Sequence, residues 1–290
     1  MPSAAREISY AHSAETKAGR AIIRTVENLT GRVSLIRKAK GYESEVAQGR
    51  DFWRVMVERY KLRLDVVRGS LENIPTEGPL ILISNHPYGI LDGLMMGHIL
   101  SEVRGSEFRI LANHVFKRAR ELDRIILPVS FEESKEAVRL NLESRKAALS
   151  FLKGGGAMGI FPGGTVSTSL RPFGEPLDPG WRTFTSKMIS KSKATVVPVF
   201  FEGHNSRVFQ VASHVHPTLR TALFVNEFRK RVGDRVPVVI GDPIDQDQIN
   251  AREGDPRQLM DFLRAQTYAL SGRSLDELDF GYEFEAVHRR

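Results

Sequence analysis

From residue 63 onward, short apolar runs of strand length alternate with longer segments of helical periodicity. The runs that predict strands are 63–68, 79–84, 108–112, 125–130, 157–161, 195–201 and 236–240. The segments that predict helices are 91–103, 114–121, 134–152, 179–191, 217–231 and 257–270. Strands separated by helices are typical of βαβ units, so the pattern predicts an α/β fold with a mostly parallel sheet flanked by helices.

Two helices are predicted before this alternation begins, over 18–39, where Gly31 is a possible break, and over 49–62. The second carries Phe52 and Trp53 beside several arginines, which suits a lipid headgroup boundary. The same residues equally suit a helix packed on its own domain with its arginines in water. We therefore predict three parts: amino-terminal basic helices facing a membrane over 1–62, an α/β domain over 63–272, and a loosely held tail over 273–290.

The chain carries a formal net charge of +7, and most of the excess lies near its start. The first 70 residues hold 14 Lys and Arg against eight Asp and Glu, whereas the remainder is nearly balanced. This asymmetry indicates an anionic partner, nucleic acid or an acidic lipid surface, or else only a solvated helix face. No stretch has the ~18–20 consecutive apolar residues that span a bilayer, so any membrane contact is expected to be peripheral.

The segment Ser84–Gly93, with the sequence SNHPYGILDG, follows an apolar strand and precedes an apolar helix. Because ligand sites gather at the carboxyl ends of strands in open α/β sheets, His86 is a candidate general base. Asp92, at the start of the next helix, could fold back and accept the other ring N–H of His86. The alternative is a helix-capping aspartate and a histidine satisfied within the turn.

A second segment, Ile160–Ser169 with the sequence IFPGGTVSTS, also follows a strand. The turn at Gly163, Gly164 and Thr165 can present backbone N–H groups to an anion, and the hydroxyl of Ser167 adds a donor. Arg171 and Arg182 lie close enough in sequence to add positive charge. Read without its context, the same stretch is an ordinary glycine loop.

The first segment resembles the signature of the glycerolipid and lysophospholipid acyltransferase family, which carries a His and an Asp a few residues apart after a strand. The commonest form has four residues between them, whereas His86 and Asp92 are separated by five. This spacing is similar to the bacterial hemolysin-like and ornithine-lipid branch, with Asn-His-Pro-x-Gly-x-x-Asp-Gly. The spacing alone leaves open whether the two side chains meet.

The second segment resembles that family's phosphate-binding block, whose usual form is Phe-Pro-Glu-Gly-Thr-Arg-Ser. Gly163 replaces the glutamate here and Val166 replaces the arginine, which argues against an acceptor recognised only by its phosphate. Val197–Gly203 is similar to a third family block that lines the acyl pocket, and Arg207 follows it as a candidate anchor for an acidic acceptor group.

The resemblance implies a glycerol-3-phosphate acyltransferase-like fold and transfer of a fatty acyl group from acyl-ACP or acyl-CoA. The acceptor would be a lysophospholipid, a glycerol-3-phosphate-type molecule or an amino lipid. His86 would be the general base and Asp92 would orient it. The residues implied to bind substrate are Asn85, Gly163, Gly164, Thr165, Ser167, Arg171, Arg182 and Arg207.

The same resemblance implies a thioester of acyl carrier protein or coenzyme A as co-substrate, and no other cofactor. The implied partner surface is anionic lipid rather than nucleic acid, with a cytoplasmic enzyme held peripherally on the inner face of the cell membrane. The sequence does not predict an oligomeric state.

Other classes of function are weighed against this one. A serine hydrolase or thioesterase would need a Gly-x-Ser-x-Gly elbow, which is absent from the sequence. A non-catalytic, basic membrane- or nucleic-acid-binding protein remains open because of the charged amino-terminal quarter. The eight histidines fit no His-Glu-x-x-His spacing, and the absence of cysteine excludes thiolate metal sites and cysteine nucleophiles.

Overall fold

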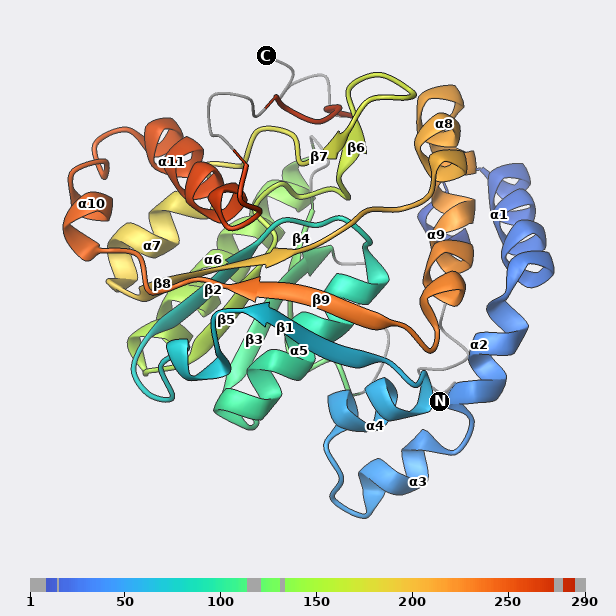
Figure 1. Cartoon of the computed structure of the whole chain (residues 1–290), viewed down its shortest axis with the longest axis horizontal. Helices are drawn as coiled ribbons and strands as arrows, with labels where there is room; N and C mark the ends of the chain where they lie inside the picture. The colour runs from blue at the N-terminus through green and yellow to red at the C-terminus, as the bar shows by residue number, and fades with distance from the viewer. Residues whose placement is uncertain (1–8, 15, 114–120, 131–133, 274–278, 285–290) are drawn as a thin grey trace.

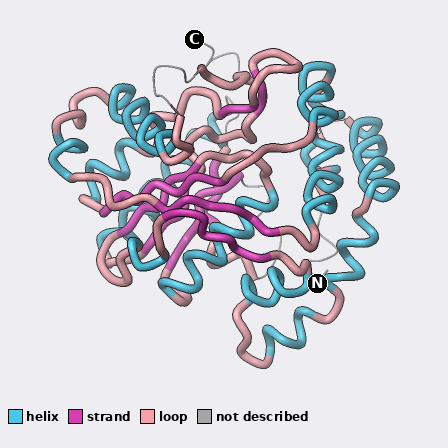
Figure 2. The backbone as a smooth tube through the Cα atoms, in the orientation of Figure 1, coloured by secondary structure: helices cyan, strands magenta, loops and turns pink. Residues whose placement is uncertain are grey.

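The computed structural model describes residues 9–14, 16–113, 121–130, 134–273 and 279–284. At its centre lies a seven-stranded sheet in the order β1-β9-β8-β2-β5-β3-β4 (Figures 1 and 2). Strands β8, β2, β5, β3 and β4 are parallel to one another, whereas β9 is antiparallel to β8 and pairs in parallel with β1. This arrangement confirms the predicted α/β class with a mostly parallel sheet.

All seven predicted strands are confirmed, with ends that differ by no more than two residues. They are β1 (Arg63–Arg68), β2 (Leu80–Ser84), β3 (Phe108–Asn113), β4 (Ile126–Val129), β5 (Ala157–Ile160), β8 (Thr195–Phe201) and β9 (Arg235–Ile240). The central strand β2 is buried on both faces, which explains its unbroken apolar sequence. A short antiparallel pair, β6 (Thr168–Ser169) and β7 (Pro176–Leu177), was not predicted.

The helices agree less closely with the sequence prediction than the strands do. Their bounds are α1 (Lys17–Thr30), α2 (Arg32–Ala39), α3 (Tyr42–Ala47), α4 (Phe52–Arg59), α5 (Ile90–Arg104), α6 (Lys135–Lys153), α7 (Ser186–Ser192), α8 (Arg207–Val215), α9 (Pro217–Arg231), α10 (Gln246–Asn250) and α11 (Pro256–Ala269). The predicted helix 18–39 is broken at Gly31, whose φ of +147° ends α1. Most of the predicted helix 114–121 lies outside the described residues.

Two further differences have local causes. The helix predicted over 179–191 begins only at Ser186. The preceding chain at Pro179-Gly180 is not helical, and there the carboxylate of Asp178 accepts the indole N–H of Trp181. The short helices α3, α8 and α10 were missed, since a single turn or two carries little periodic signal. Helix α8 nevertheless has a serine cap, as Ser206 Oγ accepts the N–H of Phe209.

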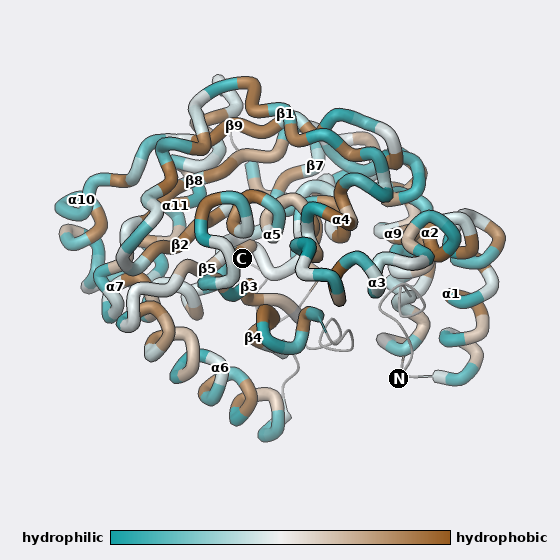
Figure 3. Tube along the Cα trace, turned by 90° about the horizontal axis from the view of Figure 1, so that it is seen from below, coloured by the Kyte–Doolittle hydropathy of each residue, from teal (hydrophilic) through white to brown (hydrophobic). Residues whose placement is uncertain are grey.

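The hydrophobic core occupies both faces of the sheet, and Figure 3 shows the apolar strands running through its centre. One face is covered by α5 and α9 together with the amino-terminal helices, whose Leu35, Tyr42 and Trp53 belong to the same buried cluster as β2. A Cβ at Gly97 would lie 2.2 Å from the indole of Trp53, so α4 packs directly on the backbone of α5. The helices within 1–62 thus share a core with the α/β domain.

The second predicted amino-terminal helix packs inward, with Trp53 buried and Phe52 partly buried. Its arginines form ion pairs: Arg50 with Glu45 and Glu58, Arg54 with Glu102, and Arg59 with Glu45. The aromatic side chains of this segment thus pack into the core, and its arginines are paired with carboxylates, as the packed-helix alternative expects. Contact of the amino-terminal helices with a membrane stays a prediction.

The carboxy-terminal tail, predicted over 273–290, is described over residues 279–284 and at residue 273. Gly281 N–H donates to the carbonyl of Asp178 and Tyr282 N–H to the carbonyl of Thr168, each at 2.9 Å. Glu283 forms an ion pair with Arg182 at 3.0 Å. The described part of the tail, 279–284, therefore lies along β6 and β7. Among the described residues, no helix combines the length and the hydrophobicity needed to cross a bilayer.

Candidate active site

The strand order brings the three sequence motifs to one edge of the sheet. Strand β2 lies between β8 and β5, and all three run in the same direction, so their carboxyl ends are adjacent. His86 follows β2, Phe161 follows β5 and Glu202 follows β8. Loops that are far apart in sequence therefore converge at the place where open α/β sheets bind ligands.

His86 and Asp92 meet at this edge. Nδ1 of His86 lies 2.8 Å from Oδ2 of Asp92, and the side chain of His86 is 18% exposed whereas that of Asp92 is fully buried. The contact is close but does not have the alignment of a hydrogen bond. The five-residue spacing thus preserves the contact, and the pair presents its imidazole, not its carboxylate, to solvent.

Asp92 is held in place by the backbone of the turn that separates it from His86. Its carboxylate accepts the backbone N–H of Tyr88 at 2.9 Å and that of Gly89 at 3.0 Å. Gly89 can turn the chain here because its φ is +91°, a conformation that costs other residues strain. These two hydrogen bonds fix the orientation of the Asp92 carboxylate in the first turn of α5.

The second segment packs directly against the first. The ring of Phe161 stacks on that of His86, with centroids 4.2 Å apart and planes at 28°. The backbone N–H of Ser167 donates to the carbonyl of His86 at 2.8 Å. The histidine is therefore fixed from one side by an aromatic ring and along its backbone by the neighbouring loop.

Asp178 is a buried residue that the sequence analysis did not single out. Its carboxylate accepts the N–H of His86 at 3.1 Å, the indole N–H of Trp181 at 2.9 Å and the hydroxyl of Ser167. Burial raises the pKa of this carboxyl above its ordinary value, although these hydrogen bonds act in the opposite direction. A Cβ at Gly163 would lie 3.2 Å from Oδ2, so Asp178 fills the space into which a side chain at position 163 would project.

Arg220, on α9, is a second buried residue that sequence reasoning missed. Its guanidinium donates to Thr168 Oγ1 at 2.6 Å, Ser213 Oγ at 3.0 Å and Thr165 Oγ1 at 3.1 Å. It also donates to the carbonyl of Val166 at 2.9 Å. Burial lowers the pKa of Arg220 below its ordinary value. Arg220 thus supports the loop that contains Val166, the residue that replaces the arginine of the family's phosphate-binding block.

Asn85 and Ser167, both predicted to bind substrate, are buried and hydrogen-bonded to other parts of the protein. Asn85 is buried and pairs with the backbone of Phe201, donating to its carbonyl at 2.9 Å and accepting its N–H at 2.8 Å. Ser167 is buried and donates to Asp178. Asn85 therefore joins the ends of β2 and β8, and Ser167 joins its loop to Asp178; a contact of either residue with substrate stays a prediction. The sequence pointed to Asn85 because this residue directly follows β2.

The remaining predicted residues are distributed more widely. Gly163, Gly164 and Thr165 form a turn next to His86, in which Gly164 has a φ of +70°. Arg182 is joined to this turn through its N–H, which donates to the carbonyl of Pro162 at 2.8 Å. Arg171 and Arg207 are exposed and lie around the β6–β7 loop, where Arg207 donates to the carbonyl of Gly174 at 2.6 Å.

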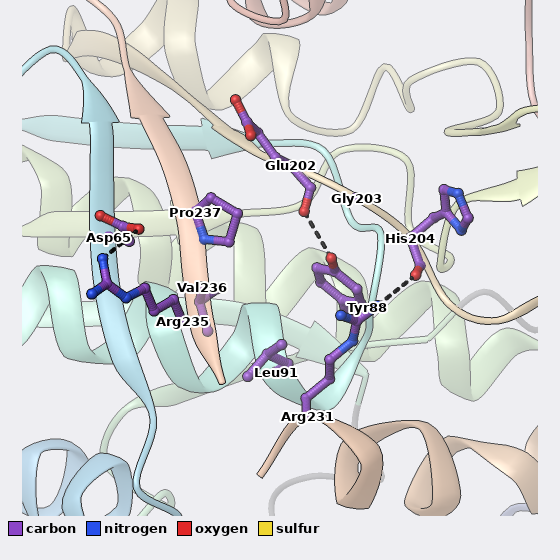
Figure 4. Close-up of a pocket in the computed structure, with 10 residues that line it drawn as sticks. All are labelled: Asp65, Tyr88, Leu91, Glu202, Gly203, His204, Arg231, Arg235, Val236 and Pro237. Carbon is purple, nitrogen blue, oxygen red and sulfur yellow. Dashed lines mark hydrogen bonds and ion pairs between the residues drawn. The ribbon is translucent and has the colours of Figure 1, made fainter. Parts of the chain in front are cut away.

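A cavity of about 470 Å³ adjoins the first motif at Tyr88 rather than at His86 (Figure 4). The Tyr88 hydroxyl donates to the carbonyl of Glu202 at 2.8 Å, and Arg231 donates to the carbonyl of His204 at 3.1 Å. Arg231 also lies over the Tyr88 ring, 4.8 Å from its centroid. These contacts fix the loop between His86 and Asp92 to the ends of β8 and α9.

The chemistry available at the site is that of acid–base catalysis. Within the described ranges, no group of three or more His, Cys, Asp or Glu side chains could hold a metal ion. The arrangement instead offers an imidazole backed by a buried carboxylate, next to a glycine turn. Such a pair can remove a proton from a hydroxyl or amine and return it to a leaving group.

Comparison with known proteins agrees with these motifs. The family described as "Acyltransferase" matches residues 48–278. A lyso-glycine lipid O-acyltransferase of Bacteroides thetaiotaomicron is 30% identical over 174 residues, 60% of this chain and 60% of that protein. A protein of the same name from Phocaeicola vulgatus is 26% identical over 235 residues, covering 79% of this chain and 80% of that one.

Among solved structures, the 1-acyl-sn-glycerophosphate (LPA) acyltransferase PlsC of Thermotoga maritima is similar, with a TM-score of 0.46 and 17% identity. The match covers 91% of this chain and 86% of that one. The family match spans most of the chain and includes both segments that converge at His86. The chain therefore belongs to the acyltransferase family.

Proposed function

We propose that this protein transfers a fatty acyl group from the thioester of acyl carrier protein or coenzyme A to a hydroxyl group of a lyso-lipid. The observation that carries the proposal is the contact between His86 Nδ1 and Asp92 Oδ2, at the edge of the sheet where the second segment packs on the histidine. An imidazole so placed can act as a base without a covalent enzyme intermediate.

In the proposed reaction, Nε2 of His86 takes the proton of the acceptor hydroxyl while the oxygen attacks the thioester carbonyl. Asp92, beside Nδ1, keeps Nε2 available and stabilises the imidazolium that forms. Collapse of the tetrahedral intermediate breaks the carbon–sulfur bond, and the imidazolium proton passes to the leaving thiolate. The products are an acyl ester and a free thiol, so all atoms and charges balance.

The turn at Gly163, Gly164 and Thr165 is the proposed source of donors for the developing oxyanion or for an anionic part of the substrate. Its closeness to His86 follows from the Phe161 stacking and from the Ser167–His86 backbone bond. A single oxyanion donor is typically worth ~2.7–4 kcal/mol. The guanidinium of Arg182 is ion-paired with Glu283, so Arg182 is proposed to position this turn through its backbone N–H, which bonds the Pro162 carbonyl.

An amino-acid lipid is the favoured acceptor class. Val166 stands where the resembling family has its phosphate-binding arginine, and it is buried against Gly89 rather than open to a ligand. The two curated relatives are both named lyso-glycine lipid O-acyltransferase, which supports an acceptor whose head carries an amino acid. We further propose that the enzyme works at the cytoplasmic face of the cell membrane, as a peripheral protein on anionic lipid.

The test is an assay of the purified protein with palmitoyl-CoA or palmitoyl-ACP, offering lyso-glycine lipid or lysophosphatidic acid as acceptor. His86→Gln should lower turnover at least ~100-fold with an unchanged unfolding midpoint. The control is His204→Gln, which alters a histidine after β8 whose Nδ1 lies 2.8 Å from the carbonyl of Asn205. This variant should retain turnover.

Each competing function predicts a different result. Release of free fatty acid from the thioester without need for an acceptor would indicate a thioesterase. Absence of any acyl transfer, with DNA binding that weakens steeply with salt, would indicate a non-catalytic basic protein. Near-normal turnover of the folded His86→Gln variant would overturn the proposed mechanism.

A further inference from the structure

Two large apolar side chains project into solvent from the loop between β6 and β7. Phe173 is 80% exposed and Leu170 is 55% exposed. The tip of this loop reads Leu170-Arg171-Pro172-Phe173, and Arg171 is exposed as well. This loop begins where the second site segment ends. An exposed aromatic ring beside an arginine is typical of a surface that binds a partner.

Helix α8 lies along this loop, as Figure 1 shows at the upper end of the helix. Ser169 N–H donates to Gln210 Oε1 at 3.0 Å, and the Ser169 carbonyl lies 2.9 Å from Nε2 of His214. At the other end of the loop, Arg207 donates to the carbonyls of Phe173 and Gly174. The loop is therefore anchored to α8 at three points and forms one surface with it.

Helix α8 exposes apolar side chains of its own. Val208 and Val215 are 63% and 67% exposed, and their spacing of seven residues places them on one side of the helix. Leu219, in the first turn of α9, is exposed too. We name this surface the α8 patch; it consists of Leu170, Phe173, Val208, Val215 and Leu219, together with Arg171 and Arg207.

The charges of the patch are of one sign. Neither Leu170–Gly174 nor Arg207–Leu219 contains an aspartate or a glutamate. Arg207 is bonded to backbone carbonyls, which leave its positive charge in place. Glu175, at the end of the loop, forms an ion pair with Arg273. The patch therefore combines exposed apolar side chains with two arginines that form no ion pair with a carboxylate in the described part of the chain.

We propose that the α8 patch docks on the surface of a lipid bilayer that contains anionic lipids. Phe173 and Leu170 would enter the boundary between headgroups and acyl chains, while Arg171 and Arg207 would contact lipid phosphates. The inference deepens the proposed function, on which it rests for the lipid nature of the substrate, but docking itself needs no chemistry at His86. Docking would bring the site edge towards the bilayer, because the patch follows directly from the Phe161–Ser169 segment.

This location differs from the amino-terminal helices over 1–62, which the sequence predicts to face a membrane. The arginines of the second of these helices are paired with carboxylates. A competing surface exists on α1 and α2, where Ile22, Leu29 and Val33 are exposed. Arginines flank both surfaces, but only the loop between β6 and β7 adds an exposed aromatic ring, Phe173, which favours the α8 patch. The experiment below compares the two surfaces directly.

The experiment measures binding of the full-length protein to vesicles of phosphatidylcholine with and without phosphatidylglycerol, by co-sedimentation. Leu170→Ser/Phe173→Ser and Val208→Ser/Val215→Ser should each weaken binding to the anionic vesicles at least about tenfold. Arg171→Gln/Arg207→Gln should weaken binding and flatten its dependence on salt. Unfolding midpoints establish that each variant is folded.

A matched control is available on α6, where Val138 and Leu142 are 57% and 53% exposed. The neighbouring Arg139 and Glu143 form an ion pair, so this surface lacks excess positive charge. Val138→Ser/Leu142→Ser should bind vesicles as the unmodified protein does. His86→Gln should also bind normally, which separates failure of docking from failure of the proposed chemistry.

Three outcomes would overturn the inference. The first is wild-type vesicle binding by both apolar variants of the α8 patch. The second is loss of binding only in Ile22→Ser/Leu29→Ser, which would assign docking to α1. The third is a dimer in solution that Leu170→Ser/Phe173→Ser dissociates without change in vesicle binding, which would make the patch an interface between two copies of the chain.

Discussion

The carboxylate of Asp178 accepts the backbone N–H of His86 at 3.1 Å, across 92 positions of sequence. The same carboxylate accepts the indole N–H of Trp181 and the hydroxyl of Ser167. One buried group thus ties the turn after β2 to the turn after β5. Because His86 and the Gly163 turn must be placed together for acyl transfer, Asp178 is a positioning residue of the proposed site.

Replacement of Asp178 by Asn should change how stability depends on pH. Burial raises the pKa of Asp178, so the folded chain holds this proton more tightly than the unfolded chain, whose aspartates titrate near ~3.9. The native protein therefore loses stability as the pH rises from ~4 through the raised pKa. Asp178→Asn has no carboxyl to titrate and does not lose stability in this way. Its unfolding midpoint should therefore rise relative to that of the native protein as the pH increases over this interval. Parallel pH curves would contradict the account.

Asp92→Asn should lower turnover by about 100-fold or more while leaving the KM for the acyl thioester little changed. The amide keeps the size of the carboxylate but cannot stabilise an imidazolium at His86, and its NH₂ group would face the N–H donors of Tyr88 and Gly89. Steady-state kinetics on a variant shown by circular dichroism to be folded is the check. If Asp92→Ala lost turnover while Asp92→Asn kept it, the role of Asp92 would be purely one of packing.

Gly89→Ala should destabilise the protein by ~1–3 kcal/mol, because φ is +91° and the new Cβ would lie 3.1 Å from Val166. It should also lower turnover, since the Gly89 N–H holds Asp92. Gly78→Ala is the matched control, with a φ of +76° and no atom within 4 Å of the added Cβ. Urea unfolding should show a smaller loss for the control, and its turnover should stay normal.

Arg220→Lys should cost ~1–3 kcal/mol of stability, since one ammonium cannot reach the four acceptors that the guanidinium holds on Thr165, Val166, Thr168 and Ser213. Arg139→Lys, at an exposed ion pair with Glu143, should change stability by less than ~0.5 kcal/mol. Comparison of the two by chemical denaturation tests whether geometry, and not charge alone, makes Arg220 important. Equal small losses would refute this.

The sequence by itself determined the seven main strands, their alternation with helices, and the candidate pair His86 and Asp92. These features are local: an apolar run marks a buried strand wherever it lies, and a His-Pro-x-Gly turn after such a strand is readable within ten residues. Strands β2 and β5 are parallel neighbours, so their carboxyl ends lie at the same edge of the sheet. The two motif loops, which follow these strands, therefore lie together there.

Only the tertiary structure decided what surrounds that pair. Asp178 and Arg220 belong to no motif, and their roles arise because a buried charge must find hydrogen-bond partners from distant elements. The burial of Trp53, the ion pairs of the α4 arginines and the docking of 279–284 along β6 likewise depend on which surfaces remain uncovered after the sheet is packed. Local periodicity carries no information about such long-range pairing, since it records which face of an element is apolar and not what that face meets.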